Sequence, residues 1–130
     1  MSDSDGPTKA LGDFVGGLRF EALPAPVVAQ AASVILDTVG CVLGAWRDDA
    51  EKAGITSKVA GPFQAEPTAT VWGGRGLKTD AAVAALANGI LANAADFDDT
   101  HKRALLHTGS VVVPPALALA EELKLSGRDI

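Results

Sequence analysis

The segment from about Ala25 to Ala45 constrains the fold most, because its pattern predicts one long helix that is apolar on most sides. Pro24 and Pro26 stand where prolines suit the entry of a helix. The apolar positions cover more than one helical stripe: Val27, Val28, Ala31, Val34, Ile35, Val39, Val42 and Leu43. Such a helix must be buried among other helices, and Asp37 is its one charged exception. The segment therefore predicts a helical bundle.

Four shorter segments also carry helical signals, so the predicted fold is all-α. They are residues 8–18, 49–59, 81–94 and 110–124. Thr8 and Asp80 suit the caps of two of these helices. Residues 61–78 lack a helical signal: Thr68–Trp72 alternates like a short strand, and a GGRG turn follows. One strand cannot form a sheet, so we expect an extended connection or one arm of a small hairpin.

The composition fits one globular domain and argues against a nucleic-acid partner. Hydrophobic residues make up 48% of the 130 positions, enough for a core, and charged residues 21%. Asp and Glu outnumber Lys and Arg by 16 to 11, which gives a formal charge of −5, whereas nucleic-acid binding needs a basic face. A small anionic ligand remains compatible, because its binding depends on local charges.

The sequence also favours a reducing, cytoplasmic setting without a membrane anchor. Cys41 is the single cysteine, and its apolar neighbours indicate a buried core residue rather than a catalytic thiol. The N-terminus, MSDSDGPTK, lacks the basic-then-apolar plan of a signal peptide. Asp37, Arg47 or Asn88 interrupts each apolar run before it reaches the roughly 20 residues of a membrane span.

The stretch DFDDTHKRALLHTGS, residues 96–110, concentrates titratable side chains in an otherwise apolar chain. If the preceding helix continues, Asp96, Asp99 and Thr100 share a face and Asp98 points elsewhere. If the helix has ended, the stretch is a loop at a helix C-terminus, where the helix dipole disfavours carboxylates. In both cases the crowded carboxylates need partners, which the neighbouring Lys-Arg pair or a histidine could supply.

His107 precedes a predicted helix start at Ser110, and Gly109 between them permits a tight turn. The free N–H groups of a helix start bind anions, including carboxylates. A histidine beside such a site suits general acid–base catalysis, because the ordinary pKa of histidine, roughly 6.5, is near neutrality. The stretch therefore suggests acid–base chemistry on a small carboxylate.

Two other hypotheses for this stretch remain open on the residues alone. Asp96, Asp99, His101 and His107 could be ligands of a metal ion, although their spacing matches no well-known metal motif. The stretch could also be a solvated acidic turn whose polar side chains satisfy one another.

The last residues, SGRDI, predict a helix that the chain does not contain. Ser126 and Asp129 have the spacing of a capping box, with Asp in place of Glu, and the chain stops after Ile130. We therefore expect residues 8–130 to be part of a longer helical domain, with residues 1–7 as a mobile tail.

Four segments resemble, in order, the N-terminal part of the MmgE/PrpD family. They are LGDFVGGLRFEALPAPVVAQAASVILDTVGCVLGA, ATVWGG, ALANGILANAADFDDTH and HTGSVVVPPALALAEELKLSGRD. The family includes 2-methylcitrate dehydratases, cis-aconitate decarboxylases and iminodisuccinate epimerases. The resemblance implies a large all-helical domain, a second, smaller α+β domain, a homodimer, and activity without a metal or organic cofactor.

The resemblance also implies site residues and a reaction class. The implied catalytic residues are His107, Asp96 and Thr100. The expected substrate-binding residues are Gly109, Ser110, Asp99 and Arg103. The family's reactions move a proton at a carbon next to a carboxylate, so we expect lyase-type chemistry on a small di- or tricarboxylic acid, most similar to 2-methylcitrate dehydration. Decarboxylation and epimerisation are alternatives, and a non-catalytic helical fragment that needs a partner chain is the alternative of another class.

Overall fold

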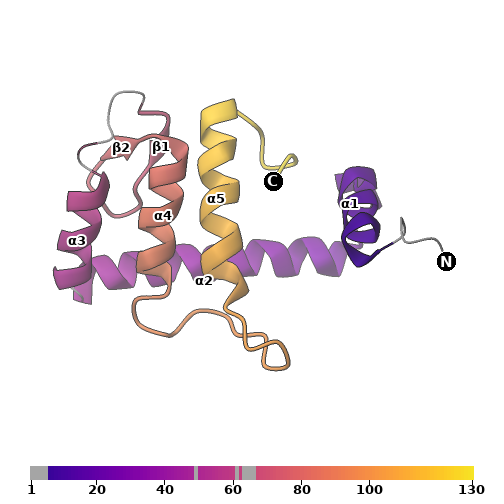
Figure 1. Cartoon of the computed structure of the whole chain (residues 1–130), viewed down its shortest axis with the longest axis horizontal. Coiled ribbons are helices and arrows are strands. Elements are labelled where there is room, and N and C mark those ends of the chain that lie inside the picture. The colour runs from indigo at the N-terminus through magenta and orange to yellow at the C-terminus, as the bar shows by residue number, and fades with distance from the viewer. Residues whose placement is uncertain (1–5, 49, 61, 63–66) are drawn as a thin grey trace.

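The computed structural model describes residues 6–48, 50–60, 62 and 67–130, and these are all-α apart from one small hairpin. The elements, in chain order, are α1 (Pro7–Gly17), the 3-10 helix η1 (Phe20–Ala22), α2 (Ala25–Asp48), α3 (Ala50–Ala60), β1 (Ala69–Thr70), β2 (Lys78–Thr79), α4 (Ala81–Ala92) and α5 (Thr108–Leu123) (Figure 1). The predicted all-α fold with a short extended segment is confirmed.

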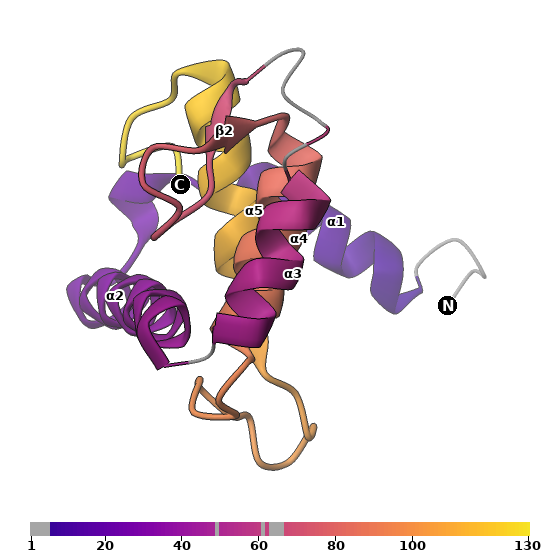
Figure 2. The ribbon, with the colours of Figure 1, turned by 90° about the vertical axis from the view of Figure 1, so that its left-hand side faces the viewer.

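Helix α2 runs the length of the molecule, and α3, α4 and α5 lie side by side across it (Figure 1, Figure 2). The alanine-rich α4 is the central helix and packs against α2, α3 and α5. Small residues allow this close packing: a Cβ at Gly89 would lie 3.0 Å from the carbonyl oxygen of Ser110 on α5. The core between α2 and α4 contains Val42, Ala45, Leu91 and Ala92.

A buried amide joins the hairpin to α4. β1 pairs antiparallel with β2, so the predicted strand is one arm of a small hairpin. The side chain of Asn88 is 1% exposed. Its Nδ2 donates a hydrogen bond to the carbonyl of Thr70 (3.0 Å), and its Oδ1 accepts one from the N–H of Trp72 (2.9 Å). These bonds satisfy backbone groups for which so short a strand offers no ladder partner.

The helix boundaries differ from the predicted ones by a few residues. α1 begins at Pro7, one residue before the predicted cap Thr8, because proline is well suited to the first helical position. Asp80 caps α4 as predicted, and its side chain accepts a hydrogen bond from a first-turn N–H at 3.0 Å. Residues 1–5 of the predicted tail and Asp49 of the third predicted helix lie outside the described residues.

The two residues with capping-box spacing near the end of the chain contact each other. Asp129 accepts hydrogen bonds from the hydroxyl and the backbone N–H of Ser126, at 2.6 and 2.9 Å. These bonds stabilise the carboxylate and hold the pKa of Asp129 below its usual range.

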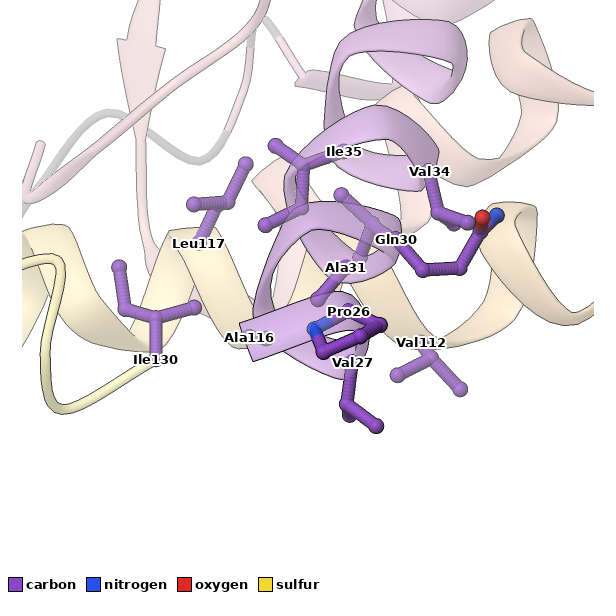
Figure 3. Close-up of a pocket in the computed structure, with 11 residues that line it drawn as sticks. Pro26, Val27, Gln30, Ala31, Val34, Ile35, Val112, Ala116, Leu117 and Ile130 are labelled. Atoms are coloured by element: carbon purple, nitrogen blue, oxygen red, sulfur yellow. The ribbon is translucent and has the colours of Figure 1, made fainter. Parts of the chain in front are cut away.

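Two helices expose large apolar surfaces. α1 has no buried residue. A groove of about 490 Å³ between the first half of α2 and α5 is lined almost entirely by apolar side chains, including Val27, Ile35 and Val112 (Figure 3). By length and composition alone, α2 could cross a membrane, and 11% of its most apolar window is buried in the structure. Core helices of soluble proteins meet the same length and composition criterion. The absence of a membrane anchor stays a prediction.

Candidate active site

Most of the titratable stretch, residues 96–107, lies in the loop between α4 and α5. α4 ends at Ala92 and α5 begins at Thr108, so the second of the two predicted alternatives is confirmed (Figure 1). Asp96, Asp99 and Thr100 therefore share no helical face. The backbone of Asp96 has a φ of 52°, in the left-handed region, which turns the chain away from the path of α4.

His107 lies between two carboxylates that differ in exposure. Its Nε2 is 3.4 Å from Asp96 Oδ1, and its Nδ1 is 3.2 Å from Asp98 Oδ1. The side chain of Asp96 is 84% exposed, that of Asp98 is 0% exposed, and that of His107 is 31% exposed. One ring nitrogen thus faces a solvated carboxylate, and the other faces a buried one.

The buried half of this arrangement contains polar atoms without a hydrogen bond. Asp98 Oδ1 accepts a hydrogen bond from Asn93 Nδ2 (3.2 Å). Asp98 Oδ2 and His107 Nδ1 have no hydrogen-bond partner among the described residues. The contact between His107 Nδ1 and Asp98 Oδ1 therefore has the distance of a hydrogen bond without its angle.

A distant carboxylate caps the start of α5. Asp99 Oδ1 accepts a hydrogen bond from the N–H of Gly109 (2.6 Å), whereas the N-cap residue, His107, provides no side-chain cap. The free N–H groups and the dipole of a helix start both favour a negative charge there. We expected a substrate carboxylate at this helix start, but the carboxylate bound at Gly109 is the protein's own.

The other predicted site residues occupy separate parts of the loop. Ser110 is buried in the first turn of α5, and its hydroxyl donates to the carbonyl of His107 (3.2 Å). The hydroxyl of Thr100 is 3.4 Å from the carbonyl oxygen of Asp98, to which it donates. Arg103 is exposed in the turn before His107. Their catalytic and substrate-binding roles stay predictions.

The predicted set of metal ligands is not brought together. Asp99 is bound at the start of α5, and His101 accepts at Nδ1 a hydrogen bond from a backbone N–H of its own turn (3.1 Å). A different set, Asp96, Asp98 and His107, has ligand atoms within 4.8 Å of one another and could approach an ion. Within this set, Asp96 lies nearest to Nε2 of the imidazole and Asp98 nearest to Nδ1.

A cleft of about 780 Å³ lies between α4 and α5 beside His107. Most of its walls are apolar, and its polar lining consists of His107, Asn93 and Ser110. An apolar cleft with a few converging polar groups is typical of a small-molecule site. The groove in Figure 3 offers only Gln30 as a polar lining side chain, so the α4–α5 cleft is the better candidate for chemistry.

Asn93 and Asp98 are the site residues that sequence reasoning did not assign. Their spacing gives no signal while the end of α4 is unknown, because a continued helix directs Asp98 away from the site. Once the helix ends at Ala92, both residues lie in the loop that follows it, and Asp98 is buried.

The sequence of this chain is similar to those of proteins of one known family. The MmgE/PrpD N-terminal domain matches residues 9–130. The cis-aconitate decarboxylase of Homo sapiens is 32% identical over 127 residues, 95% of this chain and 26% of the relative. That of Aspergillus terreus is 28% identical over 129 residues, 96% of this chain and 25% of the relative. The chain thus spans about a quarter of the length of these relatives. No solved structure matches the chain significantly. Because the family match covers nearly the whole chain, this chain belongs to the MmgE/PrpD family.

Proposed function

We propose that this chain supplies the proton-transfer residues of the active site of a lyase that acts on a small di- or tricarboxylic acid. The observation that carries the proposal is His107, which lines the α4–α5 cleft and directs Nε2 toward the exposed carboxylate of Asp96. The relatives' names support decarboxylation of cis-aconitate as the first reaction to test. Dehydration of a 2-methylcitrate-like substrate, which we expected from the motif, is the second, and epimerisation is the third.

The proposed decarboxylation is a single proton donation coupled to the loss of carbon dioxide. Protonated His107 donates a proton to the double-bond carbon next to a substrate carboxylate, and the electron pair of that double bond forms the new C–H bond. The C–C bond to the departing carboxylate breaks, and its electron pair forms the new double bond. In this proposal Asp96 and Thr100 orient the substrate, and no metal or organic cofactor takes part.

Substrate binding requires positive charge, because the loop itself contributes three carboxylates. Lys102 and Arg103 are the cations of the same loop, and both are exposed. Arg103 can bind a carboxylate through two parallel N–H groups, which a lysine cannot do. We therefore assign the substrate carboxylate to Arg103, together with those N–H groups of the first turn of α5 that Asp99 does not use.

The test combines binding with turnover. Cis-aconitate is titrated into the isotope-labelled chain while the imidazole signals of both histidines are followed, and carbon dioxide release is measured. We expect shifts at His107 and not at His101. His107→Ala should abolish turnover in a chain that still folds, and His101→Ala is the matched control. The proposal would be contradicted if His107 showed no shift and no carbon dioxide were released. Retained turnover in His107→Ala would contradict it as well.

We also propose that the protein works in the cytoplasm, as a homodimer or with a complementing chain. The exposed apolar faces of α1 and α2 support such an assembly. A helical fragment without activity of its own is the second candidate, and the same exposed faces favour it.

A further inference from the structure

We propose that Asp98 is the positioning residue of His107: it binds the Nδ1–H group and thereby leaves Nε2 free to exchange protons with a substrate in the cleft. This inference rests on the proposed function only for its consequence, since the pairing itself is a property of the folded chain.

The first argument is the pair of unsatisfied atoms. Both His107 Nδ1 and Asp98 Oδ2 are buried without a hydrogen bond among the described residues. Their side chains lie next to each other, with 3.2 Å between His107 Nδ1 and Asp98 Oδ1. A buried polar atom without a partner is costly, so the pair is stabilised when a small rotation of the ring aligns Nδ1–H with the carboxylate. One N–H···O bond then satisfies the orphaned ring nitrogen.

The second argument is that Asp98 is itself held in place. Its side chain is 0% exposed. Asn93, at the C-terminal end of α4, donates from Nδ2 to its Oδ1 (3.2 Å). A carboxylate fixed in this way can set both the tautomer and the orientation of an imidazole, as the buried aspartate of a Ser-His-Asp triad does.

Asp96 cannot take this role. It faces the other nitrogen, Nε2, and its side chain is 84% exposed, so it is well solvated. The two carboxylates therefore differ in what they can do: Asp98 can orient the ring from the buried side, whereas Asp96 is an exposed carboxylate at Nε2.

The inference predicts one tautomer. In the labelled chain, at a pH where the imidazole of His107 is neutral, we expect long-range proton–nitrogen spectra to show His107 with Nδ1 protonated and Nε2 unprotonated. His101, the other histidine, serves as an internal reference because it lies in an exposed turn. Its variant His101→Asn assigns the two signals.

Three substitutions test the cause. Asp98→Leu removes the acceptor, so the tautomer should change to Nε2–H. Asn93→Ala, on an exposed position, should weaken the preference without unfolding the chain. Asp96→Asn, the matched control on the other nitrogen, should leave Nδ1 protonated.

The readout needs neither substrate nor turnover, so it separates this inference from the proposed function. An Nε2–H tautomer in the unmodified chain overturns it, even if Asp98→Leu does not fold. An Nδ1–H tautomer that persists in a folded Asp98→Leu variant overturns it as well.

Discussion

The backbone N–H of Gly109 donates a 2.6 Å hydrogen bond to Asp99 Oδ1, so a loop carboxylate ten residues upstream caps the start of α5. Asp99→Ala should lower the unfolding free energy by about 1–2 kcal/mol, the usual effect of losing a helix cap. Asp99→Asn keeps an acceptor and should cost less, roughly 0.3–1 kcal/mol for the charge at the helix start. Urea unfolding monitored by circular dichroism measures both. Equal losses in the two variants would mean that the charge, and not the hydrogen bond, stabilises α5.

Gly109 also has no room for a side chain. A Cβ there would overlap the carboxylate of Asp99 and lie 2.6 Å from Oγ1 of Thr38, which is buried on α2. Gly109→Ala should therefore destabilise the fold by about 1–3 kcal/mol through overpacking. The control is Gly54→Ala on α3, where a Cβ meets nothing within 4 Å and should add up to about 1 kcal/mol of stability. A neutral Gly109→Ala in thermal unfolding would contradict the close packing of α5 on α2.

Asn88 should be sensitive to loss of either of its hydrogen-bonding groups. Asn88→Leu leaves the carbonyl of Thr70 and the N–H of Trp72 without these hydrogen-bond partners, at a cost of about 2–4 kcal/mol. Asn88→Asp keeps the acceptor for Trp72 but loses the donor to Thr70, and it also buries a charge. The unfolding free energy of Asn88→Asp should therefore fall as the pH rises and the new carboxylate ionises, because a buried charge is destabilising. The parent protein, which lacks this carboxylate, should not show that fall. Unfolding of both proteins at several pH values tests this difference.

Cys41 should react slowly with alkylating agents near neutral pH. Partial burial raises the pKa of its thiol, and the negative charges of Asp37, Asp98 and Asp99 raise it further. A raised pKa means less thiolate at a given pH, so the alkylation rate of the folded chain should reach its midpoint at higher pH than that of the unfolded chain. Asp37→Asn should shift this midpoint downward. Folded and unfolded chains with the same midpoint would show that Cys41 is exposed on the timescale of the reaction.

The apolar face of α1 should drive association. Leu11, Phe14 and Val15 are 65%, 64% and 66% exposed. We expect sedimentation to show association that increases with protein concentration, and Phe14→Glu should reduce it by placing a charge on that face. Gly16→Glu adds the same charge on the opposite side of the helix and is the matched control. A monomer at all concentrations, with cooperative unfolding, would show that α1 needs no partner.

Local patterns determined the helices of this protein. The apolar face of α2, the Asp80 cap of α4 and the alternation around Thr70 each depend on residues close in sequence, so they could be predicted from the chain alone. The family resemblance likewise followed from contiguous motifs, and it pointed to the loop that holds His107.

Only the tertiary structure decided the environment and the contacts of each carboxylate in the loop. Three aspartates in four positions look alike in the sequence, yet Asp96 is exposed, Asp98 is buried against His107, and Asp99 caps α5. The difference depends on where α4 ends and on how closely α5 approaches α2. Helix ends are set by a few weak interactions, and packing distances by contacts between distant residues, so neither is written in the local pattern.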